Sequence, residues 1–319
     1  MSAAGAAAGF GDALARAFGP ERARSGVGLA PFTTFKVGGP ADWLVEAMGH
    51  AEVRTALELA AAAGVPVTVL GGGSNVLVSD AGVRGLVVRV RGGAVESLTP
   101  DTVRADAGVT LNGLVRWTIA RGLAGLERWA GTPGSVGGAL YGNAHFQGRL
   151  IGDLVRRAGV VSRDGKTAQL DRAAMAFAYD DSRLRQTGEI LLWADFVVEP
   201  GDPARLREIA RASLHHRKRT QPLALPSAGC IFRNPDPGCV SLPPGVPASA
   251  GALIDRAGLK GAAVGGARVS PIHANFIVNE GGATARDIRA LVERCRAAVR
   301  ERFGVELEEE IVYLGEWSD

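Results

Sequence analysis

The spacing of apolar residues along the chain predicts a mixture of helices and strands. Apolar positions recur with a helical period in residues 50–64, 110–122, 203–219 and 284–304, and the first of these segments ends at Gly64, which suits a helix C-terminus. Alternating or β-branched runs predict strands at residues 35–37, 41–47, 65–70, 85–90, 102–108, 157–165, 190–200, 275–279 and 305–315. These elements together are typical of an α+β protein.

The length of the chain predicts more than one domain. At 319 residues it exceeds the usual size of a single hydrophobic core. We expect an Ala- and Gly-rich extension over residues 1–28, which is a flexible tail or a short helix. Two subdomains over 29–92 and 93–203 follow, and a last domain covers 204–319.

Two glycine-rich segments carry the first chemical signal. The segment "LGGGSNVLVSD" (70–80) follows a predicted strand but opens no helix of ordinary length, so it does not fit a Rossmann dinucleotide loop. Its bare amides can form an anion-binding concavity, and an ordinary glycine-rich hairpin is the alternative. The second run, "GTPGSVGGALYGNA" (131–144), favours the anion site, because two such loops suit the two phosphates of a dinucleotide.

Composition narrows the class of protein. Hydrophobic residues make up 46% and charged residues 22%, as in a folded globular protein. The formal net charge is only +3, and no basic run interleaved with aromatic residues indicates a nucleic-acid partner. Cys230, Cys239 and Cys295 form no CxxC pair, which argues against a disulfide framework and a metal site. Without a signal-peptide pattern or a membrane-spanning apolar run, we expect a cytoplasmic protein with no membrane partner.

With these motifs, the sequence resembles the UDP-N-acetylenolpyruvoylglucosamine reductase (MurB) family of flavoenzymes. The resemblance runs from about Thr33 to Gly315 and rests on five segments in the family's order: "TTFKVGGPAD", "VLGGGSNVLVSDAGVRGLVV", "GTPGSVGGALYGNA", "LPSAGCIFRNP" and "VELEEEIVYLG". It implies a two-part FAD-binding region of the vanillyl-alcohol oxidase-like (PCMH-type) fold over 29–203. It also implies a C-terminal α+β domain that binds a UDP-sugar.

The resemblance also implies which residues bind the cofactor. FAD would be held non-covalently, around its pyrophosphate and flavin, by three segments rich in bare backbone. The implied residues are Val37, Gly38, Gly39, Leu70, Gly71, Gly72, Gly73, Ser74, Asn75, Gly131, Thr132, Gly134, Ser135 and Gly138.

The implied reaction converts UDP-N-acetylglucosamine enolpyruvate to UDP-N-acetylmuramate, a step of peptidoglycan precursor synthesis. NADPH reduces the flavin, whose hydride passes to the vinyl carbon, so the protein must stabilise an enolate and protonate it. Cys230 stands where most of the family has the Ser that donates this proton. A thiol, with an ordinary pKa of about 8.5, gives up a proton more readily than a hydroxyl. A buried small apolar residue is the alternative for Cys230.

Two further catalytic positions follow from the family's motifs. Glu310 matches the family's second catalytic residue, but strict alternation puts Glu309 on the apolar face of the predicted strand, so Glu309 is its rival. The family's "YRxS" motif has an Arg that contacts the substrate carboxylate, whereas Asp180 stands there in this chain. An Asp would repel an enediolate, so we expect Arg183, or else Arg185, to replace that Arg. An exposed Arg beside Asp181 is the alternative.

The substrate is expected to contact Tyr179, Arg217, Gln221, Asn234 and Asn275. In addition, "NAHFQG" replaces the family's usual "NAGAYG", which puts His145 near the flavin as a packing or hydrogen-bonding residue.

Two other functions remain open from the sequence. One is a sugar or alcohol oxidase with the same flavin fold, and the other is a non-catalytic FAD-binding relative, which Asp180 favours. We expect a monomer whose partners are the UDP-sugar and NADPH.

Overall fold

The computed structural model describes residues 3–317, and their side chains from residue 9 onward. The chain forms two compact units built from interleaved segments. The first unit contains the residues up to Val27, Ala41–Gly72 and Arg84–His216, and the second contains Gly28–Pro40, Gly73–Val83 and the residues from Arg217 onward. The domain boundaries drawn from the sequence stay predictions.

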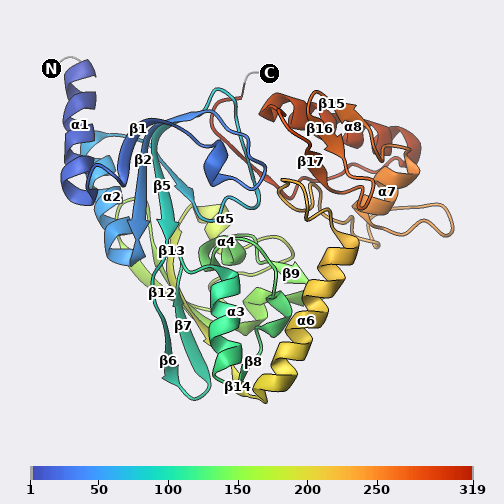
Figure 1. Ribbon diagram of the computed structural model, residues 1–319, viewed down its shortest axis with the longest axis horizontal. Helices are drawn as coiled ribbons and strands as arrows, with labels where there is room; N and C mark the ends of the chain where they lie inside the picture. Colours follow the sequence, from blue (N-terminus) through green and yellow to red (C-terminus); the bar gives the residue numbers. More distant parts are fainter. Residues whose placement is uncertain (1–2, 318–319) are drawn as a thin grey trace. The chain divides into compact units, whose positions relative to one another are not determined.

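Figure 1 labels the helices and strands in chain order. The α-helices are α1 (Ala3–Phe18), α2 (Gly49–Ala63), α3 (Leu111–Ala120), α4 (Val136–Tyr141), α5 (Arg183–Thr187), α6 (Pro203–Thr220), α7 (Ala250–Arg256) and α8 (Ala285–Phe303). Short 3-10 turns cover Ala30–Phe32, Glu127–Trp129 and Ile151–Leu154.

The first unit contains two larger sheets. One has the order β1-β2-β5-β3, with β3 parallel to β5, and the other has the antiparallel order β12-β11-β13-β7-β6. Their strands are β1 (Ala23–Gly28), β2 (Pro40–Met48), β3 (Val67–Leu70), β5 (Val83–Arg91), β6 (Val95–Thr99), β7 (Thr102–Asp106), β11 (Val155–Val161), β12 (Thr167–Asp171) and β13 (Ile190–Val197). Two short antiparallel pairs complete it: β9 (His145–Phe146) with β10 (Arg149–Leu150), and β8 (Leu123–Ala124) with β14 (Glu199–Pro200).

One hydrophobic core holds the first unit together. Helix α4 packs against β7 and β13, and α1 packs against α2. The N-terminal segment that the sequence left as a tail or short helix contributes Phe10, Leu14 and Phe18 to this core, each at most 5% exposed. This helix therefore belongs to the packing of the first unit.

The second unit has its own core around α8. That helix begins at a capping box between Thr284 and Asp287, and its buried residues recur at helical spacing. It packs against a three-stranded antiparallel sheet of β15 (Ala263–Val264), β16 (Ala267–Val269) and β17 (Ile277–Asn279). A parallel pair, β4 (Val76–Val78) with β18 (Val312–Leu314), joins the glycine-rich segment to the C-terminal segment.

Most of the predicted elements are present, and the differences have local causes. Helix α2 ends at Gly64, whose φ of 65° confirms the predicted C-terminus. The strand predicted at residues 35–37 is wrong, because Lys36 has a φ of 60° and the structure has no strand between Gly28 and Pro40. The strand predicted at 305–315 is regular only over Val312–Leu314.

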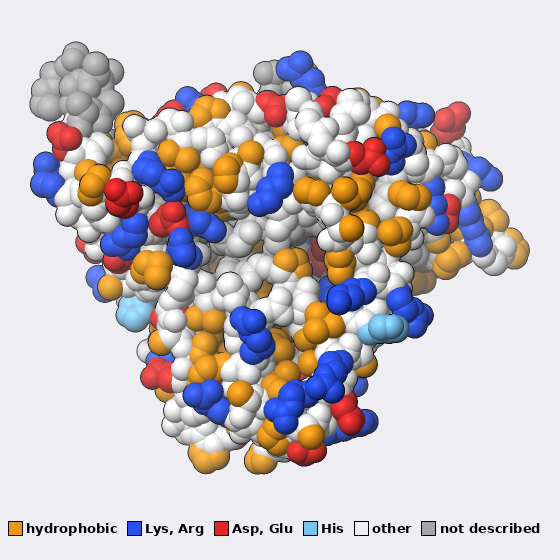
Figure 2. Space-filling model, in the orientation of Figure 1, with side chains coloured by type: hydrophobic (Ala, Val, Ile, Leu, Met, Phe, Trp, Pro, Cys, Tyr) orange, Lys and Arg blue, Asp and Glu red, His pale blue; other side chains and the backbone are white. Residues whose placement is uncertain are grey.

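The surface mixes charge and apolar side chains. On the face that Figure 2 shows, Lys and Arg side chains lie among acidic and apolar ones rather than in one continuous stripe. Within the described residues, no helix is both long and apolar enough to cross a membrane.

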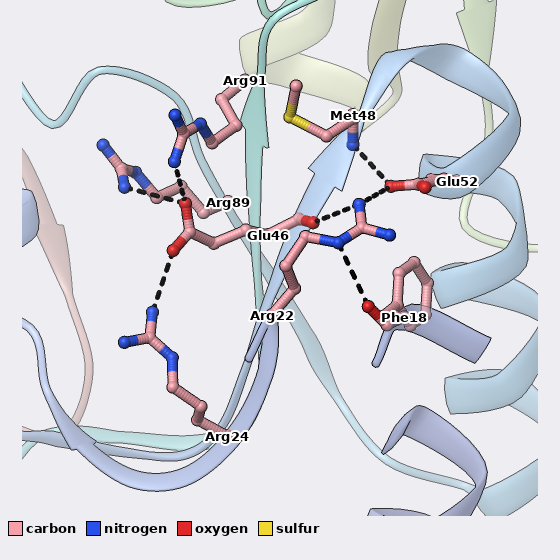
Figure 3. Close-up of polar contacts among 8 residues, drawn as sticks. All are labelled: Phe18, Arg22, Arg24, Glu46, Met48, Glu52, Arg89 and Arg91. Atoms are coloured by element: carbon pink, nitrogen blue, oxygen red, sulfur yellow. Dashed lines mark hydrogen bonds and ion pairs between the residues drawn. The ribbon is translucent and has the colours of Figure 1, made fainter. Parts of the chain in front are cut away.

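One carboxylate ties three strands of the first sheet together (Figure 3). Glu46 on β2 accepts contacts from Arg24 on β1 at 2.9 Å, and from Arg89 and Arg91 on β5 at 3.1 and 2.6 Å. Burial raises the pKa of Glu46, but the hydrogen bond from Arg91 and the nearby arginine charges outweigh it and lower the pKa below its ordinary value. Glu46 is 9% exposed, so this charge depends on its partners.

We predict that Glu46→Gln lowers the free energy of unfolding by about 2 kcal/mol at pH 7, because three arginines lose their shared anion. Unfolded Glu titrates near 4.5 and the folded pKa is lower, so the ionic contribution is present above that pH. It is lost as the pH falls through the folded-state value. Urea unfolding at pH 7 and pH 4 measures this. Glu58→Gln, which removes an exposed pair with Arg54, is the matched control and should cost less than about 0.5 kcal/mol.

Candidate active site

Two glycine-rich loops of the first unit touch each other. A Cβ added to Gly71 would lie 2.5 Å from Ser135 Oγ, and one added to Gly72 would lie 2.6 Å from Gly134 Cα. Both distances are closer than real Cβ contacts. At Gly72 the neighbour is backbone, so only glycine fits there, whereas a side chain at Gly71 would have to displace the Ser135 hydroxyl. The sequence predicted that these loops act on one ligand, and the structure brings them side by side.

The second loop is fixed by the first residues of α3 and by the segment just before that helix. Gly134 O accepts from Leu111 N at 3.0 Å, and Gly137 N donates to Ala107 O at 2.8 Å. The side chain of Asn112 accepts from Gly131 N at 2.7 Å. Ser135 caps α4, its Oγ accepting from Gly138 N at 3.3 Å. The loop therefore has a defined backbone shape before any ligand binds.

This cradle fits the FAD that the sequence predicted. Main-chain N–H groups of such glycine-rich loops are donors that a pyrophosphate can use. The N–H groups of Gly131, Gly137 and Gly138 already bond within the unit, so these three residues shape the loop rather than offer a donor. The first glycine-rich loop supplies Leu70, Gly71 and Gly72 to the contact between the two loops. The other predicted residues of this unit are Gly131, Thr132, Gly134, Ser135 and Gly138.

The remaining predicted cofactor residues, Val37–Gly39 and Gly73–Asn75, lie in the second unit. There the main chain is again too close for a side chain: a Cβ on Gly39 would overlap Asp80 O, and one on Gly73 would overlap Phe32 O. Gly73 O accepts from Thr34 N at 2.9 Å. Asp80 accepts from the N–H groups of Ala285 and Arg286 at the start of α8, so part of this motif has a structural task.

Three motifs meet around the predicted catalytic residues of the second unit. Glu310 N donates to Ile231 O at 2.8 Å, directly after Cys230 in the chain. Asn75 Nδ2 donates to Glu310 O at 3.2 Å, and Asn75 O accepts from Val312 N at 3.0 Å. The segments that carry Cys230 and Glu310 are therefore linked by main-chain contacts through Ile231.

Arg217 lies close to Cys230. Burial lowers the pKa of Arg217 to about 10, and the charge of Cys230 acts in the opposite direction. Arg217 is 7% exposed. The sequence predicted Arg217 as a substrate contact and gave no sign that it lies beside the thiol.

The other two cysteines lie in different surroundings. Cys295 is buried in α8, and burial raises the pKa of its thiol to about 12. Cys239 is exposed and donates to Asp236 at 3.3 Å.

The two candidate glutamates differ in their partners. Glu309 forms an ion pair with Arg296 of α8 and a bridge to Phe232. The alternation predicted from the sequence places Val305, Leu307 and Ile311 inward, and all three are buried. Glu309 is thus held by a structural cation, which favours Glu310 for chemistry.

Arg183, the predicted replacement for the family's Arg, lies at the start of α5 and pairs with Glu189 at 2.7 Å. The hydrogen bond that Arg183 donates to Glu189 raises the pKa of Arg183. Its charge is therefore compensated within the first unit. Tyr179 of the same unit is 42% exposed.

The predicted substrate residues of the second unit have structural partners. Asn275 is 3% exposed, and its side chain bonds to both N and O of Phe232, at 3.0 and 2.8 Å. Asn234 accepts from Ala250 N at 3.1 Å, and Gln221 N donates to Arg217 O at 2.9 Å. Asn275 thus fixes the segment that carries Cys230.

One pair was missed from the sequence. His145 Nδ1 lies 3.0 Å from Asp180 Oδ1, and Asp180 is 2% exposed. Both residues depart from the family pattern, and the coincidence of two departures was the signal available. The sequence alone did not show that they are neighbours.

Known proteins match both parts of the chain. The family model of the FAD binding domain matches residues 41–171, and that of the UDP-N-acetylenolpyruvoylglucosamine reductase C-terminal domain matches residues 221–314. The reductase from Synechococcus sp. (strain WH7803) is 42% identical over 91% of this chain and 92% of its own length. Reductase 2 of Symbiobacterium thermophilum is 42% identical over 93% of both chains.

A solved structure agrees with these relatives. The crystal structure of UDP-N-acetylenolpyruvylglucosamine reductase (MurB) from Thermus caldophilus matches with a TM-score of 0.75 and 35% identity, covering 90% of this chain and 97% of that one. The fold and the bare-backbone cradle define an FAD-binding oxidoreductase with an α+β fold. The chain belongs to the UDP-N-acetylenolpyruvoylglucosamine reductase (MurB) family, whose cofactors are FAD and NADPH.

We predict that Gly72→Ala weakens FAD binding by about 10- to 100-fold, since overpacking against Gly134 costs roughly 1–3 kcal/mol. Flavin absorbance per protein after reconstitution measures the change. Gly142→Ala is the matched control, because its Cβ meets nothing within 4 Å and the position has an ordinary φ of −97°. Equal flavin content in both variants would show that this contact does not shape the cofactor site.

Proposed function

We propose that this chain reduces UDP-N-acetylglucosamine enolpyruvate to UDP-N-acetylmuramate with NADPH, supplying a precursor of peptidoglycan. Membership of the family supports the reaction. The single structural observation that carries it is the linkage of Cys230, Glu310 and Asn75 through main-chain contacts within the second unit.

FAD, when bound, supplies the two-electron reduction of the vinyl group. The protein has to hold the substrate, stabilise the enolate and deliver one proton to carbon. We assign the proton to the Sγ–H of Cys230, which leaves a thiolate. The guanidinium of Arg217 favours that thiolate electrostatically, because a nearby cation stabilises the charged form of a thiol.

The remaining residues position this acid. Asn275 clamps Phe232, and Asn75 clamps the backbone of Glu310, so both reacting side chains extend from fixed main chain. Glu310 takes the role of second catalytic residue, and the ion pair of Glu309 with Arg296 supports this choice over its rival. Tyr179, Gln221 and Asn234 stay predicted substrate contacts, and Arg183 stays the predicted carboxylate contact of the sequence.

Anaerobic stopped-flow spectroscopy tests the proposed function. NADPH should bleach the flavin, and the absorbance should recover only when the enolpyruvyl sugar nucleotide is added. Rapid recovery in air without that substrate would identify an oxidase instead. Bleaching without recovery on adding the substrate would identify a non-catalytic flavoprotein.

We predict that Cys230→Ala slows the substrate-dependent recovery by about 100-fold or more, which is the usual contribution of a general acid. Bleaching by NADPH should be unchanged, and Cys230→Ser should keep substantial activity. Cys239→Ser, at an exposed position where the thiol bonds to Asp236, is the matched control. Equal loss of both half-reactions in Cys230→Ala would reject the assigned role.

A further inference from the structure

The pair of His145 and Asp180 is built into the first unit by a tight turn. Residues 178–181 form this turn, in which Ala178 and Asp181 exchange main-chain hydrogen bonds. Asp180 has a φ of 51°, a conformation that residues other than glycine seldom adopt. The turn places Oδ1 of this buried carboxylate 3.0 Å from His145 Nδ1. Strained backbone of this kind is often found at functional sites.

Two further bonds lock the segment of His145 to this turn. Asn143 is fully buried and donates from Nδ2 to Ala178 O at 2.7 Å. Ser182 is also fully buried and donates from Oγ to Tyr141 O at 2.8 Å. The ring of Tyr179 lies 4.8 Å from the imidazole. The His145 ring is therefore held by its neighbours, while its side chain is still 30% exposed.

The carboxylate of Asp180 affects the protonation of the His145 imidazole. Asp180 beside Nδ1 favours a proton on that nitrogen and stabilises the imidazolium form. The protonated pair is electrically neutral and offers a charge-assisted N–H donor at Nε2. The deprotonated pair carries one negative charge and repels an anion. The same residues thus change from anion-binding to anion-repelling as the imidazole loses its proton.

We propose that His145, oriented by Asp180, is the donor that binds the carboxylate of the substrate and stabilises its enolate. This inference rests on the proposed function, and it gives Asp180 a positioning role where the family has a cation. The Nε2 proton stays on His145 during the reaction.

Other charged groups of the first unit lie on elements close to His145. Arg185 donates to Asp180 O at 3.0 Å, and Asp181 accepts from Ser182 N and Gln186 Nε2. The charge of Arg183 is compensated by Glu189. The elements packed against His145 also carry Arg149 on β10 and His216, whose ring contacts Phe146.

Ligand binding to the FAD-loaded protein tests this inference. Calorimetry would compare UDP-N-acetylmuramate, which carries the carboxylate, with UDP-N-acetylglucosamine, which lacks it. The wild-type preference for the carboxylate ligand should fall by about tenfold or more between pH 6 and pH 9, because a charge-assisted hydrogen bond is replaced by repulsion. His145→Gln should lose that preference at pH 6 and show no pH dependence, with its affinity for UDP-N-acetylglucosamine unchanged.

Two further variants keep the test decisive if His145→Gln folds poorly. His145→Arg provides a permanent cation and should keep the preference at both pH values. Asp180→Asn should move the loss of preference to lower pH by about one unit. In the NMR spectrum of the protein, the titration midpoint of the His145 ring should move by the same amount. His50→Gln removes an exposed His 3.9 Å from Asp106 and should behave as wild type.

The outcomes separate this inference from the proposed function. A wild-type protein that binds neither ligand would overturn both. A His145→Gln variant that keeps a pH-dependent preference for the carboxylate ligand would overturn the inference alone. The inference would also be overturned if Arg183→Gln lost that preference while His145→Gln kept it.

Discussion

The close approach of two glycine-rich segments is the constraint on which the proposed flavin site depends. Gly72 lies so close to the backbone of Gly134 that a Cβ is excluded, and Gly71 lies against the Ser135 hydroxyl. The first loop follows strand β3, and the second is fixed by bonds to the main chain around the start of α3 and to the side chain of Asn112. Two rigid structures therefore meet at a surface made mostly of backbone, which favours a ligand recognised through N–H groups rather than through cations.

In the second unit, the segments that carry the proposed catalytic residues are held in place without a regular strand. Cys230 and Glu310 lie on segments joined through Ile231, and Asn75 and Asn275 bond to the main chain on either side. The side-chain amides of these two asparagines make hydrogen bonds to the main chain that a neighbouring strand would make in a regular sheet. The segment that carries Cys230 is thus positioned by groups that the sequence identified only as ligand contacts.

The sequence predicted long, periodic elements well and short or irregular ones poorly. Helices α2 and α8 follow directly from apolar periodicity and their terminal residues. Helix α4 was not predicted from the sequence, because Gly137 and Gly138 are poor helix formers. The helix depends on its Ser135 cap and on packing against β7 and β13. The pairing of His145 with Asp180, 35 residues apart, follows from tertiary structure that no local pattern encodes.

A crystal structure of the protein loaded with FAD tests the central claim most directly. The account predicts the pyrophosphate within hydrogen-bond distance of main-chain amides from both glycine loops of the first unit. A pyrophosphate held instead by arginine side chains, with neither loop in contact, would contradict it.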